Sequence, residues 1–492
     1  MSSASVLYSA AQVRALDAYA IAQGTDGYTL MRRAAEAALR ALRSRWPTAM
    51  RVVIVTGGGN NGGDGYVLAR FAQAAGLTAA VLAAVPPLLL RADALRAYED
   101  FRASGGRILD YEPALLSACD VIVDALLGTG LREPVRPALA QVIAAINACD
   151  RPVFSLDLPS GLNADSGEVM GAAVSADCTI SFVALKTGLF LGSAPEFVGR
   201  LIFDDLEVSP PEEVRFRPLL ERLGEGEIAR TLPRRRREAN KGDFGRVLIV
   251  GGGPGMPGAV RLAGESCLRV GAGLVTVATA RDNLSAVVAG RPELIVHAVD
   301  AVATLLPLLA SADVVAVGPG LGQSPWAQAM LESVFGCGKP LVIDADALNL
   351  LAQSARSAPA HSVLTPHPGE AGRLLGSSAA LVQSDRMAAL GALQARHPDS
   401  VIVLKGAGTL IGAAGRIPGI CERGNPAMAA PGMGDVLTGA IAGILAQCHD
   451  LWLAARAGVL AHALAGDELA RDRSRGILAL ELAEAMSRWV NL

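Results

Sequence analysis

The sequence predicts an α/β protein of two domains, each built around a mainly parallel sheet. Short apolar runs alternate along the whole chain with longer segments whose apolar residues recur at helical spacing. Runs that are apolar throughout are typical of parallel strands covered by helices on both faces. A length of 492 residues corresponds to about two to four domains, and a composition of 51% hydrophobic and 18% charged residues excludes a disordered chain.

The apolar runs give the order of the expected elements. The predicted strands are residues 51–56, 121–124, 152–157, 246–250, 273–279, 313–317, 340–344 and 400–404. The segments between them, such as residues 65–75 and 258–270, have the helical pattern. This alternation predicts helices that cross from one parallel strand to the next.

A proline- and acid-rich stretch at residues 208–213 indicates the domain boundary. A charged segment ending in Arg234–Arg237 follows, and a new strand–glycine unit starts at Gly245. We therefore predict one domain over residues 1–215 and a second over residues 225–492. The arginine run is expected to be a solvated linker, with phosphate binding as the alternative.

Composition and charge exclude several classes of function. The net charge of −3 and the 4% of aromatic residues argue against a nucleic-acid-binding protein. Seven cysteines without a C-x-x-C pair predict reduced thiols in a cytoplasmic protein. The N-terminal residues do not have a signal-peptide pattern. The longest apolar stretch, residues 78–90, is shorter than the roughly 20 residues that span a bilayer, so no membrane association is expected.

In the first domain, polar residues follow three of the predicted strands. Residues 57–65 form a glycine-rich loop with a helix expected from Tyr66, while Asp124 and Asp157 end the next two runs. Such strand ends converge on one crevice. Asparagine, aspartate and serine oxygens suit a hard cation, and a second carboxylate could act as a general acid or base. The alternative is that both aspartates cap the turns that follow them. The chain contains no P-loop pattern.

These motifs resemble the NAD(P)H-hydrate epimerases. The resemblance rests on residues 60–65, 124–130 and 157–161, and on residues 11–17 and 30–31 near the N-terminus. It implies a Rossmann-like three-layer domain that interconverts the R and S epimers of nicotinamide cofactors hydrated at C6. It implies that the hydrate contacts Asn60, Asn61, Gly62, Gly63, Asp64, Gly128, Thr129, Gly130, Leu131, Arg132, Glu133, Pro134 and the catalytic Asp157. Asn61, Asp124 and Ser160 would ligate potassium.

In the second domain, a glycine turn at residues 431–434 opens a long apolar helical stretch. Amide groups at a helix start favour a developing anion, and Asp435 could accept a proton from an attacking hydroxyl. The alternative for Asp435 is a favourable charge in the first helical turn. His367 is expected either to bind a ligand or to form part of a turn. The six histidines do not cluster at ligand spacing, so no zinc site is expected.

This arrangement looks ribokinase-like, and the motifs resemble the ADP- or ATP-dependent NAD(P)H-hydrate dehydratases. The whole chain is thus similar to the bifunctional repair enzymes that fuse both activities, whose bacterial members use ADP and release AMP and phosphate. The resemblance implies that Ala259, Gly320, His367 and the catalytic Asp435 contact the hydrate. Lys405, Gly406, Ala407, Gly408, Thr409 and Gly434 would contact the adenine nucleotide, and magnesium would bridge its phosphates.

Two departures from the family pattern stand near this site, and two other functions remain open. Pro431 has no N–H to offer an anion, and Phe244 stands where histidine is common. One alternative function is a ribokinase-like kinase of a small alcohol, with an N-terminal domain that binds a nucleotide without catalysis. Another is a non-catalytic, nucleotide-sensing first half. The expected ligands are NADHX, NADPHX and ADP, and a symmetric homo-oligomer is expected.

Overall fold

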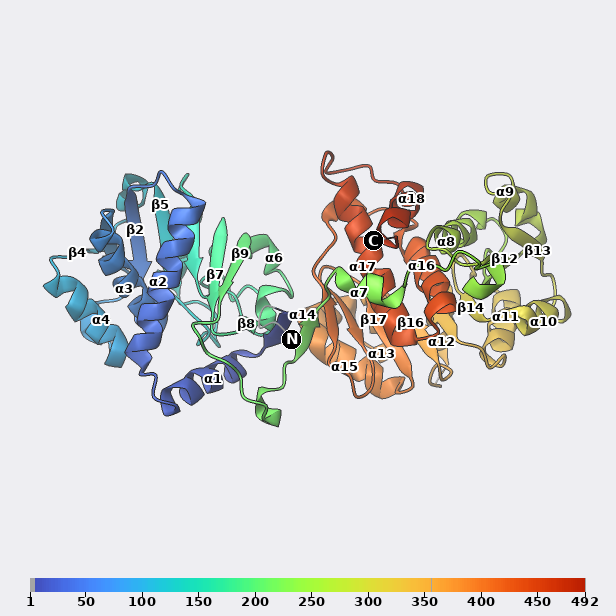
Figure 1. The fold of residues 1–492 in the computed structure, drawn as a ribbon, viewed down its shortest axis with the longest axis horizontal. Helices are drawn as coiled ribbons and strands as arrows, with labels where there is room; N and C mark the ends of the chain where they lie inside the picture. Colours follow the sequence, from blue (N-terminus) through green and yellow to red (C-terminus); the bar gives the residue numbers. More distant parts are fainter. Residues whose placement is uncertain (1–4, 355, 492) are drawn as a thin grey trace. The chain divides into compact units, whose positions relative to one another are not determined.

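The computed structural model describes residues 5–354 and 356–491 and divides into two compact units. Unit 1 comprises Met1–Leu220 and unit 2 comprises Glu221–Leu492. Each unit is an α/β fold with its own sheet (Figure 1). No helix in these two described ranges is long and apolar enough to cross a membrane.

Unit 1 is built on a seven-stranded sheet in the order β4-β3-β2-β5-β6-β7-β9, in which every neighbouring pair is parallel. Its strands are β2 (Arg51–Thr56), β3 (Thr78–Ala83), β4 (Arg107–Asp110), β5 (Val121–Ala125), β6 (Val153–Leu156), β7 (Cys178–Phe182) and β9 (Arg200–Asp204). A short parallel pair outside the seven-stranded sheet joins β1 (Val6–Tyr8) to β8 (Leu185–Lys186). The helices are α1 (Ala10–Ala22), α2 (Gly27–Arg45), α3 (Asn60–Ala74), α4 (Ala92–Ala103), α5 (Pro137–Asn147) and α6 (Pro195–Val198).

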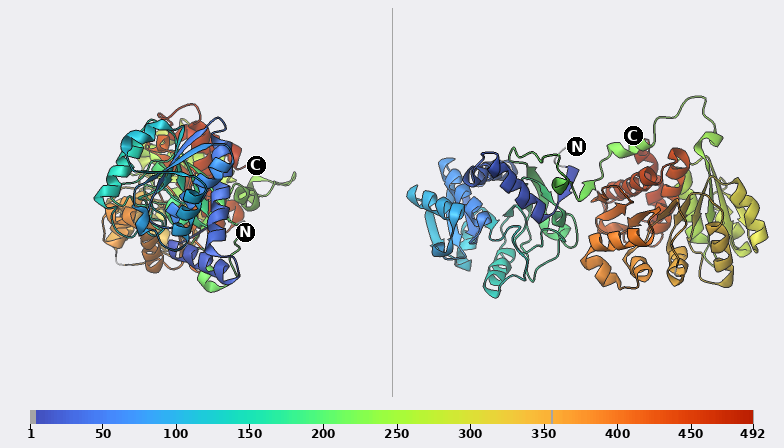
Figure 2. Two further views of the ribbon diagram at one scale, coloured as in Figure 1. Left: turned by 90° about the vertical axis from the view of Figure 1, so that its left-hand side faces the viewer. Right: turned by 90° about the horizontal axis from the view of Figure 1, so that it is seen from below.

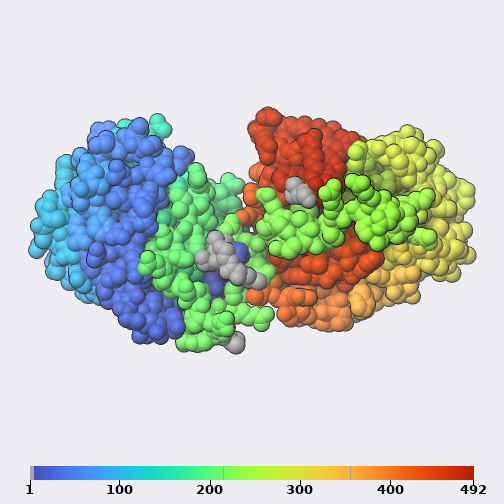
Figure 3. Space-filling model, viewed as in Figure 1, coloured from blue at the N-terminus to red at the C-terminus, as the bar shows by residue number. Residues whose placement is uncertain are grey.

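Helices cover both faces of this sheet, which makes unit 1 a three-layer fold. In β2, Val52 and Ile54 pack into the core under α2, α3 and α4, whereas Val53 and Val55 pack into the core on the side of α5. This two-residue alternation explains why the strand is apolar throughout. The space-filling view shows the N-terminal helices (blue) against the segment near residue 200 (green) (Figure 3). Arg40 of α2 pairs with Asp204 of β9 at 3.0 Å.

Unit 2 is built on a larger sheet in the order β13-β12-β11-β14-β15-β16-β17-β18-β19-β10. The strands are β10 (Leu220–Arg222), β11 (Arg246–Val250), β12 (Leu274–Thr279), β13 (Ile295–Ala298), β14 (Val314–Val317), β15 (Leu341–Ile343), β16 (Ser362–Leu364), β17 (Ser400–Leu404), β18 (Thr409–Gly412) and β19 (Gly419–Cys421). The pairs from β13 to β17 are parallel, whereas β18 runs antiparallel to both of its neighbours.

Two helix layers enclose the sheet of unit 2 (Figures 1 and 2). The helices are α7 (Gly226–Thr231), α8 (Pro257–Arg269), α9 (Leu284–Val288), α10 (Val302–Ser311), α11 (Pro325–Phe335), α12 (Ala345–Gln353), α13 (Pro368–Leu375), α14 (Ala379–Ser384), α15 (Arg386–Arg396), α16 (Met433–Cys448), α17 (Leu451–Leu469) and α18 (Ala479–Trp489). Helix α16 is buried along nearly its whole length, between α8, α17 and the sheet. The strands that it contacts, β11, β14 and β15, lie in the middle of the sheet.

The predicted fold class, α/β with mainly parallel sheets, is confirmed. The strands predicted at residues 51–56, 246–250 and 400–404 have the same bounds in the structure, and the others differ by one or two residues at their ends. The hairpin of β18 and β19 was not predicted from the sequence. All seven cysteines are free, as expected.

The arginine run and Phe244 are connected in the structure. Residues 234–237 are exposed, as expected of a solvated segment. Arg235 nevertheless stacks its guanidinium over the ring of Phe244, 3.5 Å from the ring centroid, and donates to Gln447 Oε1 at 2.8 Å. The phenylalanine that departs from the family pattern therefore anchors one arginine of the run to unit 2.

Candidate functional site

The candidate site of unit 1 lies where the strand order of its sheet reverses. The chain runs from β2 outward to β3 and β4 and then returns to β5 on the other side of β2. Ligands of open parallel sheets bind beyond the carboxyl ends of the strands at such a point. Asn61 lies just after β2, Asp124 lies in β5, and Asp157 follows β6. Three of the predicted residues therefore meet at one edge.

The glycine-rich loop after β2 passes directly into helix α3. The helix begins at Asn60, and its N-cap Gly59 provides no side-chain cap. The prediction that the helix starts at Tyr66 is wrong, because the glycines themselves form its first turn. A Cβ at Gly62 would lie 2.2 Å from the carbonyl oxygen of Gly57, so only glycine permits this close approach. Tertiary packing thus outweighs the low helix propensity of glycine.

Asn61, Asp124 and Ser160 form an oxygen-rich cluster beneath the loop. Ser160 Oγ donates to Asp124 Oδ1 at 2.6 Å and accepts from the Leu127 amide at 2.8 Å. Asn61 Nδ2 donates to Leu127 O at 3.0 Å. Asn61 Oδ1 is buried and has no hydrogen-bond partner among the described residues. Hard oxygen ligands, one of which has no hydrogen-bond partner, suit a hard cation.

Asp124 also caps the turn that follows β5, which was the alternative to a ligand role. Its Oδ1 accepts from the Leu126 amide at 3.2 Å, and its Oδ2 accepts from the Ser160 amide at 2.8 Å and from Ser155 Oγ at 2.9 Å. Burial raises the pKa of the Asp124 carboxyl, and the hydrogen bonds from Ser160 oppose this rise. The capping contacts and the oxygen cluster coexist in one side chain.

Asp157 is fixed at the pocket by an ion pair with Lys186. Its backbone has a φ of +68°, a left-handed conformation that aspartate tolerates better than most residues. The Lys186 side chain is 1% exposed, and its ammonium also donates to Ser181 Oγ at 3.0 Å and to Phe182 O at 2.9 Å. These contacts use all three N–H bonds of the ammonium. Asp157 therefore faces the pocket with a buried cation behind it.

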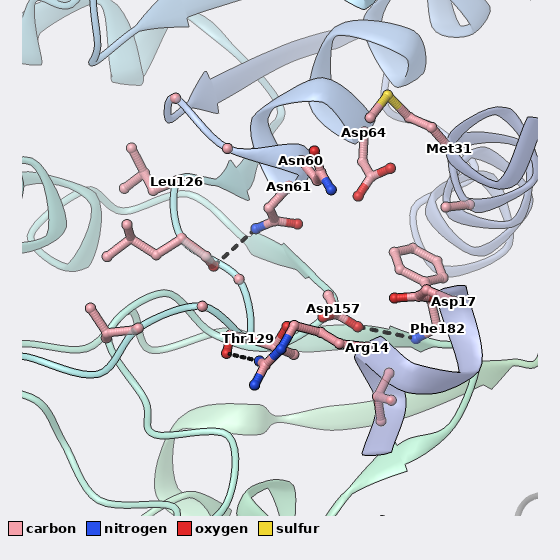
Figure 4. A pocket seen from close by; sticks show the side chains of 18 of the residues that line it. Arg14, Asp17, Met31, Asn60, Asn61, Asp64, Leu126, Thr129, Asp157 and Phe182 are labelled. Carbon is pink, nitrogen blue, oxygen red and sulfur yellow. Dashed lines mark hydrogen bonds between the residues drawn. The ribbon is translucent and has the colours of Figure 1, made fainter. Parts of the chain in front are cut away.

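Two further carboxyl groups face the same pocket, which has a volume of about 760 Å³. Burial raises the pKa of Asp64 well above its usual range, and the negative charges of Asp157 and Asp17 add to this effect. Burial also raises the pKa of Asp17 to about 6. Figure 4 shows Asp17, Asn61, Asp64 and Asp157 arranged around one central space. The pocket thus combines an ion-paired carboxylate, Asp157, with two carboxyl groups whose pKa values are raised.

Most residues predicted to bind the hydrate in unit 1 line this pocket. They are Asn60, Asn61, Asp64, Gly128, Thr129, Gly130, Leu131, Arg132, Glu133, Pro134 and Asp157. Gly62 and Gly63 lie in the first turn of α3, where they allow close packing against Gly57 and Met31. The structure therefore gives these two glycines a packing role.

Sequence reasoning missed Lys186 and Asp17. Lys186 is the only charged residue between Cys178 and Leu191, and a lone charge within an apolar run was a usable signal. Asp17 lies on α1, where an aspartate on an amphipathic helix cannot be distinguished from a solvated one. Its place at the pocket depends on how α1 packs in the folded unit.

The second candidate site lies at the corresponding reversal in unit 2, between β11 and β14. The glycine loops that follow these two strands contact each other. The Gly252 amide donates to Pro319 O at 2.9 Å, and the Gly253 amide donates to Gly320 O at 2.7 Å. A Cβ at Gly320 would lie 3.1 Å from Cβ of Ala259. Two residues predicted to contact the hydrate, Ala259 and Gly320, are therefore adjacent.

Asp344, at the end of β15, joins three elements of this site. Its Oδ1 accepts from Lys405 Nζ at 2.8 Å and from Thr365 Oγ1 at 2.8 Å. Its Oδ2 accepts from Thr438 Oγ1 of α16 at 2.8 Å. Burial alone would lower the pKa of Lys405, but Asp344 and Glu370 raise it. The ammonium of Lys405 is therefore directed into the protein.

Asp435 lies in the first turn of α16, which begins after Gly432. Burial raises the pKa of Asp435 to about 7, with the charge of Asp344 adding to the rise and Lys405 opposing it. A Cβ at Gly434 would lie 3.5 Å from Lys405 Nζ. Asp435, Gly434 and Lys405 are thus neighbours, and a carboxyl group with this pKa can exchange a proton near neutral pH.

His367 is the N-cap of α13. Its Nδ1 accepts from the Gly369 amide at 3.0 Å and from the Glu370 amide at 3.4 Å, and burial lowers its pKa. The imidazole side chain is 50% exposed. A structural turn role, which was one of the two alternatives, is thus present, and the other ring nitrogen lies 3.4 Å from Glu370 Oε1.

No group of three or more His, Cys, Asp or Glu side chains within the described ranges is arranged to hold a metal ion. The cluster around Asn61 in unit 1 is of a different kind, because amide, hydroxyl and carbonyl oxygens supply most of its donors. Such a cluster favours a hard cation rather than zinc.

Two family models match the chain, one for each unit. The model described as YjeF-related protein N-terminus matches residues 27–188, and the model described as NAD(P)H-hydrate dehydratase matches residues 247–488. The chain is 47% identical to the bifunctional NAD(P)H-hydrate repair enzyme Nnr of Coxiella burnetii, over 99% of each chain. It is 43% identical to the enzyme of the same name from Escherichia coli, over 95% of this chain and 90% of that one.

Solved structures match about half of the chain. A ribokinase-like superfamily protein from Enterococcus faecalis is 33% identical and aligns with 57% of this chain and 98% of its own, with a TM-score of 0.52. A hypothetical protein from Streptococcus mutans is 32% identical over 55% of this chain and 98% of its own, also with a TM-score of 0.52. The expected ribokinase-like fold is confirmed by the first of these.

Proposed function

This chain belongs to the family of bifunctional NAD(P)H-hydrate repair enzymes, and we propose that unit 1 epimerises hydrated NADH and NADPH while unit 2 dehydrates the S epimer with ADP. The observation that carries the proposal is the pair of sites at the two sheet reversals. Each site contains carboxyl groups suited to proton transfer. The unit 1 site has Asp157 and Asp64, and the unit 2 site has Asp435. A small-alcohol kinase is not favoured, because the named relatives match both units.

The proposed epimerisation uses one proton acceptor and one proton donor. The hydrate has a hydroxyl group on C6 next to the ring nitrogen. The Asp157 carboxylate accepts the hydroxyl proton, the C6–N bond breaks to give an aldehyde, and the ring nitrogen takes a proton from Asp64. Rotation and the reverse steps close the ring on the other face, so that both carboxyl groups return to their starting states. The ion pair with Lys186 and the raised pKa of Asp64 support these roles.

The donor set around Asn61 fits the potassium ion that the family resemblance implies. Asn61 Oδ1 is the buried oxygen without a partner, and Asp124, Ser160 and Leu127 O lie in the same cluster. We assign the ion to Asn61, Asp124 and Ser160. When bound, it would supply positive charge beside the pocket that receives the hydrate.

The proposed dehydration begins with phosphoryl transfer to the C6 hydroxyl. Asp435 accepts the hydroxyl proton while the hydroxyl oxygen attacks the terminal phosphorus of ADP and AMP leaves. The C6–O bond then breaks, with phosphate carrying away its electrons, and the C5 proton passes to solvent water, which restores the dihydronicotinamide. Ala259, Gly320 and His367 would contact the hydrate, while residues 405–409 and Gly434 would contact the nucleotide. Magnesium, when bound, would neutralise the developing phosphate charge.

The full-length protein tests this proposal directly. We expect a mixture of R and S NADHX, incubated with ADP, magnesium and potassium, to regain all of its NADH absorbance, with one AMP and one phosphate formed per NADH. The same mixture without ADP should change only in its epimer ratio. No recovery of NADH with ADP present would contradict the proposal.

A further inference from the structure

Arg386 is buried in unit 2 without a carboxylate partner. It is the first residue of α15 and is 4% exposed. In the described part of the chain, no aspartate or glutamate forms an ion pair with it, and burial lowers its pKa to about 10. A buried guanidinium without a counter-ion is costly, so its contacts require an explanation.

The guanidinium instead binds backbone carbonyl groups of one loop. Its Nη2 donates to Leu404 O at 3.0 Å and to Gly408 O at 3.2 Å, and its Nη1 donates to Lys405 O at 3.3 Å. Nη1 also donates to Gln383 Oε1 at 2.7 Å. Three carbonyl groups of the turn between β17 and β18 therefore point toward one buried cation.

The same turn leaves amide groups on its outer side. Gly406 and Ala407 are exposed, and neither amide donates to a protein acceptor among the described residues. Gly406 has a φ of +138°, and a Cβ there would lie 2.8 Å from Arg386 Nη1. Gly406 O accepts from Thr409 Oγ1 at 3.0 Å. Carbonyls directed inward and amides directed outward are the arrangement that binds anions.

We propose that Arg386 is a positioning residue for the adenine nucleotide: it gathers the carbonyl groups of residues 404, 405 and 408 so that the Gly406 and Ala407 amides face the nucleotide phosphates. This rests on the proposed binding of ADP by residues 405–409. Arg386 itself does not touch the nucleotide. Lys405, whose ammonium is bound to Asp344, adds positive charge behind the loop.

Kinetics of the full-length protein test this role. Arg386→Met should raise the KM for ADP about tenfold or more and change kcat of dehydration by less than about threefold, because positioning of a bound phosphate is lost while Asp435 is untouched. Arg386→Lys keeps the charge with fewer donors and should give an intermediate KM. Arg396→Met, at the other end of α15, is the matched control and should leave both constants unchanged. Epimerase activity of each variant reports on unit 1.

The outcomes separate this inference from the proposed function. ADP-independent or absent dehydration by the unaltered protein would contradict the proposed function itself. An unchanged KM for ADP in Arg386→Met and Arg386→Lys, with normal dehydration in the unaltered protein, would overturn only the role of Arg386. If Arg386→Met loses the thermal transition of unit 2, Arg386→Lys decides the question. Loss of that transition in both variants would show a folding role and would also overturn the proposal.

Discussion

Lys186 and Asp157 form an ion pair at the edge of the unit 1 pocket, and the lysine side chain is almost fully buried. The ammonium has two further acceptors, Ser181 Oγ and Phe182 O, so it cannot turn toward a ligand without losing contacts. The lysine therefore orients the aspartate, and both residues line the pocket. This arrangement makes the two residues separable by mutation.

Replacement of Lys186 by methionine should abolish epimerisation and destabilise unit 1. Removal of one partner of a buried ion pair costs about 3–5 kcal/mol, because the other charge is left without compensation. The double variant Lys186→Met/Asp157→Asn should regain most of the lost stability but no epimerase activity. Urea unfolding and an epimerisation assay measure both effects. A fully active, equally stable Lys186→Met protein would exclude the positioning role.

The cation cluster predicts a potassium requirement that depends on Asn61. In Asn61→Ala, the oxygen without a partner is removed, and the potassium concentration for half-maximal epimerisation should rise about tenfold, as expected for one lost charge-assisted contact. Asn60→Ala is the matched control, because its side chain faces the pocket outside the cluster and should alter only the KM for the hydrate. Epimerase activity that is independent of potassium in the unaltered protein would refute this assignment.

Gly62 should be irreplaceable for steric reasons, unlike a glycine elsewhere at the same pocket. A Cβ at Gly62 would meet the Gly57 carbonyl, whereas a Cβ at Gly130 would have no atom within 4 Å. Gly62→Ala should therefore lower the melting temperature of unit 1 by several degrees, consistent with a loss of about 1–3 kcal/mol from overpacking. Gly130→Ala should leave the melting temperature unchanged. Equal melting temperatures for the two variants would contradict this packing argument.

The strands could be predicted from the sequence, but parts of the sites could not. Runs such as residues 51–56 are apolar because both of their faces are buried, and this signal is local. The early start of α3 at Asn60 depends on the contact between Gly62 and Gly57, which no local propensity encodes. Strand ends predicted that Asp124 and Asp157 lie at one edge of the sheet, because parallel strands share one edge. Asp157 lines the pocket, whereas Asp124 is fully buried and does not line it.

The residues that were missed act across large sequence separations. Lys186 contacts Asp157 across 29 positions of the sequence. Arg386, in α15, contacts the loop at residues 404–408 after β17. Each lies outside any strand-end motif. Asp344 was noted only as the end of a predicted strand, although it contacts Lys405, Thr365 and Thr438. Such side-chain networks follow from the packing of whole elements and require the structure.

The ionisation of Asp435 should make both the dehydration activity and the stability of unit 2 depend on pH. Its pKa of about 7 means that the folded protein favours the protonated form, so its contribution to stability is present at low pH and is lost as the pH rises through about 7. Asp435→Asn should therefore raise the melting temperature of unit 2 more at pH 8 than at pH 5, while abolishing dehydration. Thermal scans at both pH values check this. A larger gain at pH 5 would contradict the raised pKa.

Removal of the negative charge of Asp344 should move the acid limb of the profile of dehydration kcat against pH to lower pH. Asp344 raises the pKa of Asp435, so Asp344→Asn should move the half-maximal rate to lower pH. Lys405 loses an anionic partner in the same variant, so a lower maximal rate is expected as well. The measurement is kcat against pH at saturating ADP and hydrate. A profile that keeps its midpoint or moves to higher pH would rule out this electrostatic coupling.

In the proposed function, two separate carboxyl groups, Asp157 and Asp435, perform two different steps on one chain. The most direct measurement is NADH recovery from an equal mixture of R and S NADHX with ADP, magnesium and potassium, followed with Asp157→Asn and Asp435→Asn proteins. We expect Asp157→Asn to regenerate the S half quickly and leave the R half, and Asp435→Asn to regenerate no NADH while still equilibrating the epimers. Complete, rapid recovery by Asp157→Asn, or loss of both activities in either folded variant, would contradict the division of labour between the two units.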